Sequence, residues 1–128
     1  DSLARRMRST AKLPKEQSFA AMNRLQEHMI FAARAHTDRV ILEAFIAGLE
    51  KTDDANARAL LERVCDLYAL SSIEDDRGWF LEHTRLSASQ TKDLTAAIDD
   101  LCEELRAQAV LLVDGLGVPE KWLQAAML

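Results

Sequence analysis

Apolar residues recur every three or four positions along three long stretches of the chain, with polar residues between them. This spacing is typical of amphipathic α-helices. The first stretch follows Pro14, starts near Glu16 to Ser18 and runs to about Glu50. Its apolar positions are Phe19, Met22, Leu25, Met29, Val40, Leu42, Phe45, Ile46 and Leu49. We therefore predict one helix here, about 50 Å long at 1.5 Å per residue.

The second stretch follows the connection "KTDDANA" (51–57). Asp53 or Asp54 can accept hydrogen bonds from the free N–H groups of the next turn and cap the helix. The apolar positions behind this cap are Leu60, Leu61, Val64, Leu67, Tyr68 and Ile73. Gly78 marks the point at which this second helix is expected to bend or end.

The third stretch begins at Ser87, and Gln90 three residues later completes the pattern of a capping box. Its apolar positions, close to a coiled-coil seam, are Leu94, Ile98, Leu101, Leu105, Ala109 and Leu112. Gly115 or Gly117 can adopt the left-handed conformation that closes a helix. Pro119 suits the first turn of a short last helix, "PEKWLQAAML".

These patterns predict an all-α fold, an antiparallel helical bundle of three long helices plus a short C-terminal helix. No strand-like alternation bounded by turn residues competes with this prediction. The 128 residues are enough for one domain, and 4 Gly and 2 Pro leave few sites for tight turns. We divide the chain into a basic N-terminal arm or linker, 1–17, and a helical domain, 18–128.

The arm carries five basic residues and no acidic one in "RRMRSTAKLPK" (5–15). It is either a solvated linker or an arm that contacts phosphate or a partner. The whole chain has a formal net charge of −5, which argues against general nucleic-acid binding. No apolar run approaches the roughly 20 residues that cross a bilayer, so we expect no membrane span and a cytoplasmic protein. The start at Asp1, without Met, suggests either a piece of a longer polypeptide or processing.

Candidate catalytic and metal-binding residues are sparse. His28, His36 and His83 lack the Glu-x-x-His spacing of helical di-metal sites, so no metal site is predicted. An acid–base cluster is conceivable where several ionisable groups lie close in sequence. Those groups are Glu74, Asp75, Asp76, Glu82 and His83. Consecutive acidic residues on a helix are more often solvated, and Asp75 or Asp76 can pair with Arg77 or Arg85.

Two cysteines and a few aromatic residues complete the candidates. Cys65 and Cys102 each lie in an apolar helical pattern, so we expect both to be buried, reduced thiols. The alternative is a disulfide between them. Trp79 and Phe80 are expected to pack, one into the core and the other at the edge of the bundle or at an interface. Together with Trp122 they are our interface or packing candidates.

Two segments of the chain resemble a known family. "LYALSSIEDDRGWFLEH" (67–83) and "LVDGLGVPEKWL" (112–123) are similar to the C-terminal helical domain of acyl-CoA oxidases, especially bacterial ones related to acyl-CoA dehydrogenases. A weaker match is "LQEHMIFAARAHTDRVILEAF" (25–45). The similarity covers nearly all of the chain after about Ser18.

The resemblance implies a parent protein that oxidises fatty acyl-CoA to trans-2-enoyl-CoA with bound FAD, as an oxidase or a dehydrogenase. It implies that the catalytic glutamate and the main flavin-binding motifs lie upstream, so no catalytic or cofactor-binding residue is assigned in this chain. The partners implied are the N-terminal catalytic domains of the same polypeptide, a second copy in a homodimer, and the acyl-CoA substrate. The alternative is a free-standing helical interaction or dimerisation module without enzymatic activity.

Overall fold

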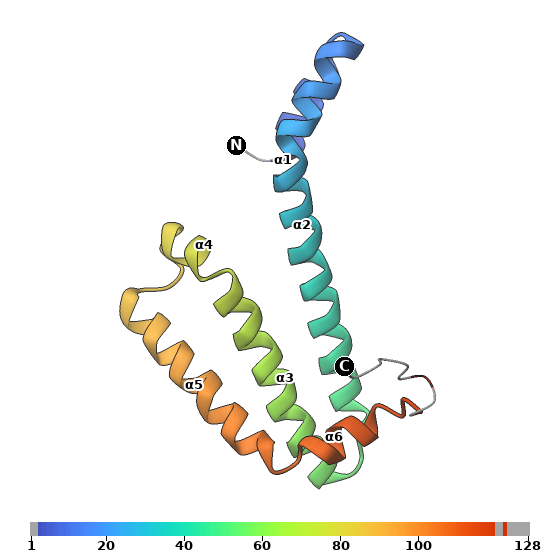
Figure 1. Ribbon diagram of the computed structural model, residues 1–128, viewed down its shortest axis with the longest axis vertical. Coiled ribbons are helices and arrows are strands. Elements are labelled where there is room, and N and C mark those ends of the chain that lie inside the picture. Colours follow the sequence, from blue (N-terminus) through green and yellow to red (C-terminus); the bar gives the residue numbers. More distant parts are fainter. Residues whose placement is uncertain (1–2, 120–121, 123–128) are drawn as a thin grey trace, which may run out of the picture. The chain divides into compact units, whose positions relative to one another are not determined.

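The computed structural model describes residues 3–119 and Trp122, and every regular element among them is helical (Figure 1). The all-α class is therefore confirmed. The helices are α1 (Leu3–Thr10), α2 (Lys15–Glu50), α3 (Ala55–Asp75), α4 (Arg77–Glu82), α5 (Ala88–Arg106) and α6 (Ala109–Gly115). None of these helices is both long and apolar enough to cross a bilayer.

The chain divides into two compact units, Asp1–Phe45 and Ile46–Leu128. The boundary falls inside α2, whose bounds agree with the predicted first helix. The position of the first unit relative to the second is not determined, so the packing of α2 on the later helices stays a prediction. The division of the chain into an arm, 1–17, and a helical domain, 18–128, also stays a prediction.

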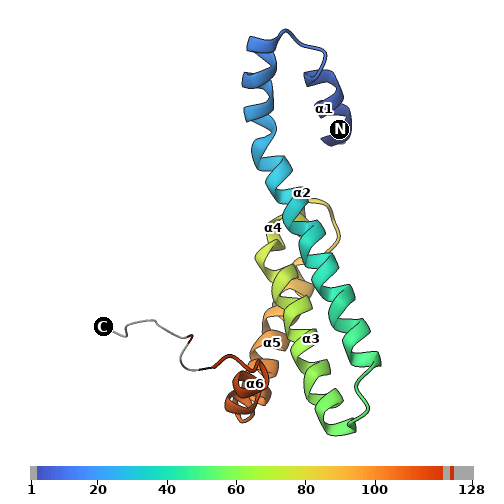
Figure 2. The same cartoon turned by 90° about the vertical axis from the view of Figure 1, so that its right-hand side faces the viewer.

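In the first unit, α1 folds back beside the first turns of α2 (Figure 2). From the sequence we described this basic segment only as an arm or linker, and the structure shows a helix in it at residues 3–10. Leu3, Met7 and Thr10 are spaced by four and three, so they share one covered side of α1. The basic side chains between them are exposed, which made the segment look like a plain linker.

In the second unit, α3 and α5 run antiparallel and form the main helix pair (Figure 1). Its buried apolar residues are Cys65, Leu94, Leu101 and Leu105. Both predicted N-terminal caps are present. Asp54 accepts a hydrogen bond of 2.7 Å from the backbone N–H of Ala57. Ser87 and Gln90 bond reciprocally at 3.2 and 2.9 Å, which is the capping box.

The break between α3 and α4 lies at Asp76 and not at Gly78. Asp76 has φ −103° and ψ 19°, a conformation that needs no glycine. Gly78 instead lies inside α4. This short helix ends in two backbone hydrogen bonds, from Thr84 to Leu81 at 3.1 Å and from Arg85 to Phe80 at 2.8 Å. They form a Schellman motif, and Thr84 takes its left-handed position with φ 52°.

The predicted third helix is interrupted, which corrects our expectation of one helix through Leu112. Helix α5 ends at Arg106, and after Ala107 and Gln108 the chain continues as α6. The reason lies in the partner helix. Helix α3, on which α5 packs, begins at Ala55, so a straight α5 would run past the N-terminal end of α3. Helix α6 instead turns across that end of α3 (Figure 1).

The chain leaves α6 through a glycine turn. Gly117, one of the two predicted positions, has φ +63°. Its N–H donates to the carbonyl of Asp114 at 3.0 Å, and this satisfies one carbonyl at the helix end. The predicted last helix, "PEKWLQAAML", lies mostly outside the described residues, so it stays a prediction.

Candidate functional site: an aromatic turn and an apolar helix

An aromatic turn, which we define as Trp79, Phe80 and His83, occupies α4 and its C-terminal cap. The Trp79 and Phe80 rings meet edge to face, with centroids 5.3 Å apart and planes at 83°. His83 stacks on Trp79 at 4.2 Å with planes only 19° apart. Consecutive aromatics are thus joined to each other within one helical turn. Phe80 is half-buried and Trp79 is 39% exposed, so this turn still presents aromatic surface to solvent.

His83 is engaged with this turn and not with the neighbouring carboxylates. Its Nδ1 lies 2.9 Å from the backbone carbonyl oxygen of Trp79. Since a carbonyl oxygen can only accept, Nδ1 carries the proton and donates. The same ring also stacks on Trp79. These contacts fix the imidazole as part of the helix end, and they do not build the acid–base cluster considered from the sequence.

Glu74 ties the end of α3 to α5. Its Oε1 accepts from Arg77 at 3.0 Å and from the Thr95 hydroxyl at 3.2 Å. The ion pair of Arg77 is thus with Glu74, whereas the sequence suggested Asp75 or Asp76. Oε2 of Glu74 is buried and has no hydrogen-bond partner. The link holds α4 against the start of α5, and it leaves one carboxylate oxygen unsatisfied at that junction.

The three histidines do not come together with other ligands. In the part of the chain that the structure describes, no group of three or more His, Cys, Asp or Glu side chains could hold a metal ion. His36 lies on α2 with its Nδ1 3.5 Å from Arg39. His28 is two turns earlier on the same helix, and His83 belongs to the second unit.

Both cysteines are free thiols, so the disulfide alternative is excluded. Cys65 is buried between α3 and α5, where burial and, to a smaller extent, the charge of Asp66 raise the pKa of its thiol above the usual 9.0. Cys102 is exposed, which corrects the expectation of two buried thiols. The preceding residue, Leu101, is buried in the contact between α5 and α3, so Cys102 lies at the edge of that contact.

Helix α6 and the residues after it expose most of their apolar side chains. We call this set the α6 surface: Val110, Leu111, Val113, Leu116 and Val118. Val110 is 75% exposed and Leu116 is 74% exposed. From the sequence, Ala109 and Leu112 were expected to continue the apolar seam of the third helix, and the other residues of the α6 surface were not singled out. The available signal was "AVLLV" (109–113), five consecutive apolar residues that leave a helix without a polar face.

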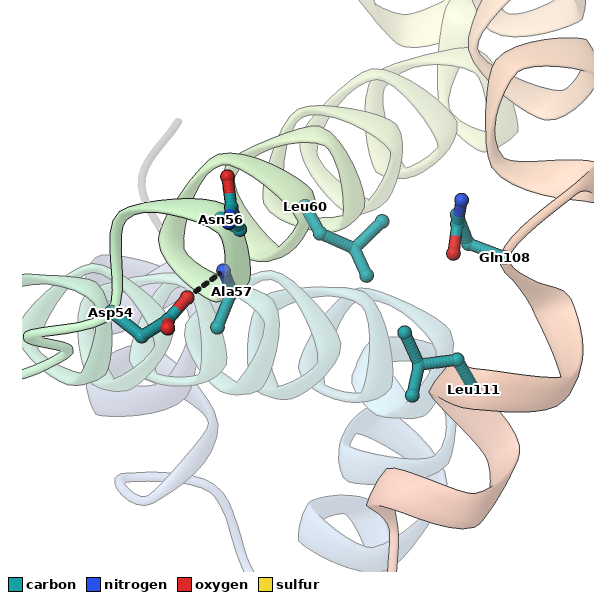
Figure 3. A pocket seen from close by; sticks show the side chains of 6 residues that line it. All are labelled: Asp54, Asn56, Ala57, Leu60, Gln108 and Leu111. Atoms are coloured by element: carbon teal, nitrogen blue, oxygen red, sulfur yellow. Dashed lines mark hydrogen bonds between the residues drawn. The ribbon is translucent and has the colours of Figure 1, made fainter.

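Two hollows flank α6 where it crosses α3. One, of about 500 Å³, lies between the start of α3 and α6. Leu60 and Leu111 point into it from facing sides, and Asp54, Asn56 and Gln108 form its polar rim (Figure 3). The other hollow has a volume of about 350 Å³. Its lining is Val64, Leu67, Cys102, Leu105, Arg106, Ala109, Leu112 and Val113. Both hollows beside α6 are open to solvent.

The interface candidates from the sequence fall in two places. Trp79 and Phe80 form the aromatic turn, and Trp122, which is 71% exposed, follows the α6 surface along the chain. Whether any of the three contacts another domain stays a prediction. The geometry so far defines a class: an all-α protein that exposes apolar and aromatic surface and whose described residues assemble no catalytic constellation.

Comparison with known proteins gives this class a family. The family model described as acyl-CoA oxidase matches residues 2–127. A mouse acyl-coenzyme A oxidase-like protein is 28% identical over 97% of this chain. The peroxisomal acyl-coenzyme A oxidase 2 of Arabidopsis thaliana is 32% identical over 80% of this chain, and the rabbit peroxisomal acyl-coenzyme A oxidase 2 is 34% identical over 75%. The chain belongs to the acyl-CoA oxidase family.

The match covers only a small part of each relative. It spans 20% of the mouse protein, 15% of the Arabidopsis protein and 14% of the rabbit protein. The chain thus corresponds to a fifth or less of the length of these curated relatives. Its resemblance to the family, first indicated by residues 67–83 and 112–123, is confirmed over nearly its whole length.

Proposed function

We propose that this chain is the C-terminal helical domain of an FAD-dependent acyl-CoA oxidase or dehydrogenase that acts in fatty-acid β-oxidation. The parent protein removes one hydrogen each from the α and β carbons of a fatty acyl-CoA and forms the trans-2-enoyl-CoA. Bound FAD is the electron acceptor of this reaction. The observation that carries the proposal is the acyl-CoA oxidase family match over residues 2–127.

The hollow between the start of α3 and α6 does not fit FAD. The larger hollow is rimmed by the carboxylate of Asp54, which already caps α3, and no cationic side chain lines it. A dinucleotide pyrophosphate needs cations or a cradle of backbone N–H groups. On the family resemblance, we assign the flavin, the catalytic base and the acyl-CoA site to the preceding domains of the parent. Within that parent, the helical domain packs on the catalytic domains and supports a homodimer.

The compartment of the parent is a separate prediction. Several relatives are named as peroxisomal proteins, such as those of Arabidopsis thaliana and rabbit. The sequence led us to a cytoplasmic bacterial parent, and this stays a prediction.

The test is a visible spectrum of the protein produced from the complete reading frame that contains this sequence. A flavin band that bleaches when acyl-CoA is added without oxygen would support the proposed reaction. Rapid recovery of the band in air, with hydrogen peroxide formed, would identify an oxidase, and slow recovery a dehydrogenase. A colourless protein that does not take up FAD would contradict the enzyme and leave the alternative, a helical interaction or dimerisation module.

A further inference from the structure

The basic segment singled out in the sequence has no role in the proposed function. The structure folds it into a helical hairpin, which we define as residues 3–26: α1, the turn at 11–14 and the first turns of α2 (Figure 2). Leu3, Met7 and Thr10 lie on the covered side of α1, so the basic side chains are turned to solvent. Those exposed side chains are Arg5, Arg6, Arg8, Lys12 and Lys15. Glu16 is the single acidic residue of the hairpin, which therefore carries concentrated positive charge.

Two large apolar side chains are exposed among these cations. Leu13 is 41% exposed in the turn that ends the hairpin, and Lys12 lies directly before it. Phe19 is 72% exposed and lies four residues after Lys15, so the two share one side of α2. Segments that bind the surface of a bilayer combine these two elements, because cations attract anionic headgroups and apolar side chains enter the boundary with the acyl chains. The hairpin has both.

Another folded domain is a poor match for this surface. The cores of protein–protein interfaces are depleted in charged residues, and Lys is depleted in such interfaces relative to the rest of the surface. Covering the hairpin with protein would remove its exposed cations from water, and Glu16 is the one carboxylate that the hairpin supplies to offset them. A lipid surface avoids this cost, since basic side chains stay hydrated at the headgroups while their apolar neighbours insert.

Single-stranded nucleic acid is the other polyanion to consider, and the hairpin fits it less well. Proteins bind such strands in a positively charged groove, with aromatic side chains on which successive bases stack. Phe19 is the single aromatic residue of the hairpin, and Leu13 offers no ring for stacking. An exposed leucine at the end of a basic hairpin instead suits the acyl boundary of a bilayer.

We propose that the hairpin is a docking surface for a bilayer that contains anionic phospholipids. Its cations bind the headgroup phosphates, and Leu13 and Phe19 enter the interfacial region. The whole chain has a net charge of −5 although residues 5–15 contribute five positive charges, so the remainder is strongly acidic and is repelled by the same surface. This asymmetry orients the chain with the hairpin towards the lipid. The inference goes beyond the proposed function, because it requires neither FAD nor acyl-CoA.

The experiment measures how much of the protein, produced from the complete reading frame, sediments with vesicles at about 0.1 M NaCl, where charges act over about 10 Å. One set of vesicles is phosphatidylcholine alone, and the other also contains the anionic phosphatidylglycerol. The hairpin variant combines Arg6→Gln, Arg8→Gln and Lys12→Gln. The matched control removes the same charge from exposed side chains outside the hairpin. It combines Arg39→Gln, Arg58→Gln and Arg63→Gln.

We expect the unmodified protein to bind the anionic vesicles at least about tenfold more tightly than the neutral ones. Each cation near an anionic surface strengthens binding roughly fivefold, so the hairpin variant should lose at least about tenfold and the control less than about threefold. Equal losses in the two variants would show that net charge alone matters and would overturn the proposal. Failure of the unmodified protein to bind the anionic vesicles would also overturn it.

Two single substitutions, Leu13→Ser and Phe19→Ser, keep the charge and test the insertion of apolar side chains. Each should weaken binding to anionic vesicles by about threefold to tenfold, because less apolar surface enters the lipid. Ile30→Ser is the control, since Ile30 is 61% exposed on α2 but lies outside the hairpin. Unchanged binding of both hairpin variants would contradict docking on lipid. Far-ultraviolet circular dichroism of each variant confirms that the helical content is unchanged.

Two further readouts separate the docking surface from its alternatives. Binding of single-stranded RNA that the hairpin variant loses, without binding to anionic vesicles, would place a nucleic acid on the hairpin and overturn the proposal. The flavin band and its bleaching by acyl-CoA report the proposed reaction in the same samples. A colourless protein that sediments with anionic vesicles would sink the enzyme and leave the docking surface standing. A yellow, active protein that stays in solution would do the reverse.

Discussion

Helices α5 and α6 are neighbours in the chain, separated by Ala107 and Gln108, yet they differ in capping, burial and polar residues. Helix α5 has a capping box at its start, three buried leucines against α3 and charged residues on its outer side. Helix α6 has no side-chain cap, its sole charged residue is Asp114, and almost all of it is exposed. The comparison shows that α5 is stabilised by its own capping box and by its contact with α3, whereas α6 exposes most of its apolar side chains.

The largest expected effect comes from the core of the α3–α5 pair. Leu101→Ala should lower the free energy of unfolding of the 128-residue chain by about 2–4 kcal/mol, because it removes a buried side chain and leaves a cavity. Val110→Ala is the contrast on α6, and it should change the same quantity by less than about 0.5 kcal/mol, since this side chain is already in water. Urea unfolding measures both variants. Equal losses would abolish the distinction between the two helices.

The next effect concerns the local signal that starts α5. Ser87→Ala removes the acceptor of the Gln90 N–H and should lower the free energy of unfolding by about 1 kcal/mol. Ser89→Ala, two residues further in the first turn, is exposed and outside the capping box. Thermal unfolding should therefore distinguish the two serines. A loss as large for Ser89→Ala would mean that the box does not define the start of the helix.

A smaller effect, of opposite sign, is expected at the end of α4. Thr84 is β-branched and holds a left-handed conformation, which is strained for such a residue. Thr84→Gly should raise the free energy of unfolding by roughly 0.5–1 kcal/mol, because glycine adopts this conformation without a steric penalty. Thr37→Gly is the control inside α2, where the same change should destabilise by roughly 0.3–0.5 kcal/mol. If Thr84→Gly is destabilising as well, the turn is not strained.

The smallest effect is a pH dependence at Cys65. Because burial raises the pKa of this thiol, the unfolded chain loses the proton at a lower pH than the folded chain. The folded state then binds more protons, so stability should fall as the pH rises past about 9. Cys65→Ala lacks this loss, and its difference in stability from the unmodified chain should shrink between pH 9 and 11, by less than about 1 kcal/mol. Between pH 7 and 8 the difference should be constant, and a flat difference up to pH 11 would contradict the shift.

The sequence was sufficient where a feature depends on nearby residues. The cap at Ser87 and the bounds of α2 were predicted, and Asp54 and Gly117 were each one of two predicted positions, because these features follow from chemistry within one or two turns. The break between α3 and α4 lies at Asp76, two residues before the predicted Gly78. Many residue types can adopt the backbone conformation of Asp76, so the sequence does not indicate it.

The sequence failed where a feature depends on the partner surface. The end of α5 at Arg106 is set by the place where α3 begins, and periodicity in one segment cannot contain that information. Helix α1 was missed for a related reason, because its covered side is short and basic side chains dominate its composition. For the candidate site, the role of Trp79 and Phe80 in packing or at an interface stays a prediction, and the stacking of His83 on Trp79 was not expected.

The exposed α6 surface also bears on the fate of a faulty molecule. In any copy that leaves the α6 surface uncovered, Val110 and Leu116 stay in water. Exposed apolar surface of this kind promotes aggregation, and chaperones and proteases act on the molecules that display it. A copy that leaves the α6 surface uncovered would then be marked for removal.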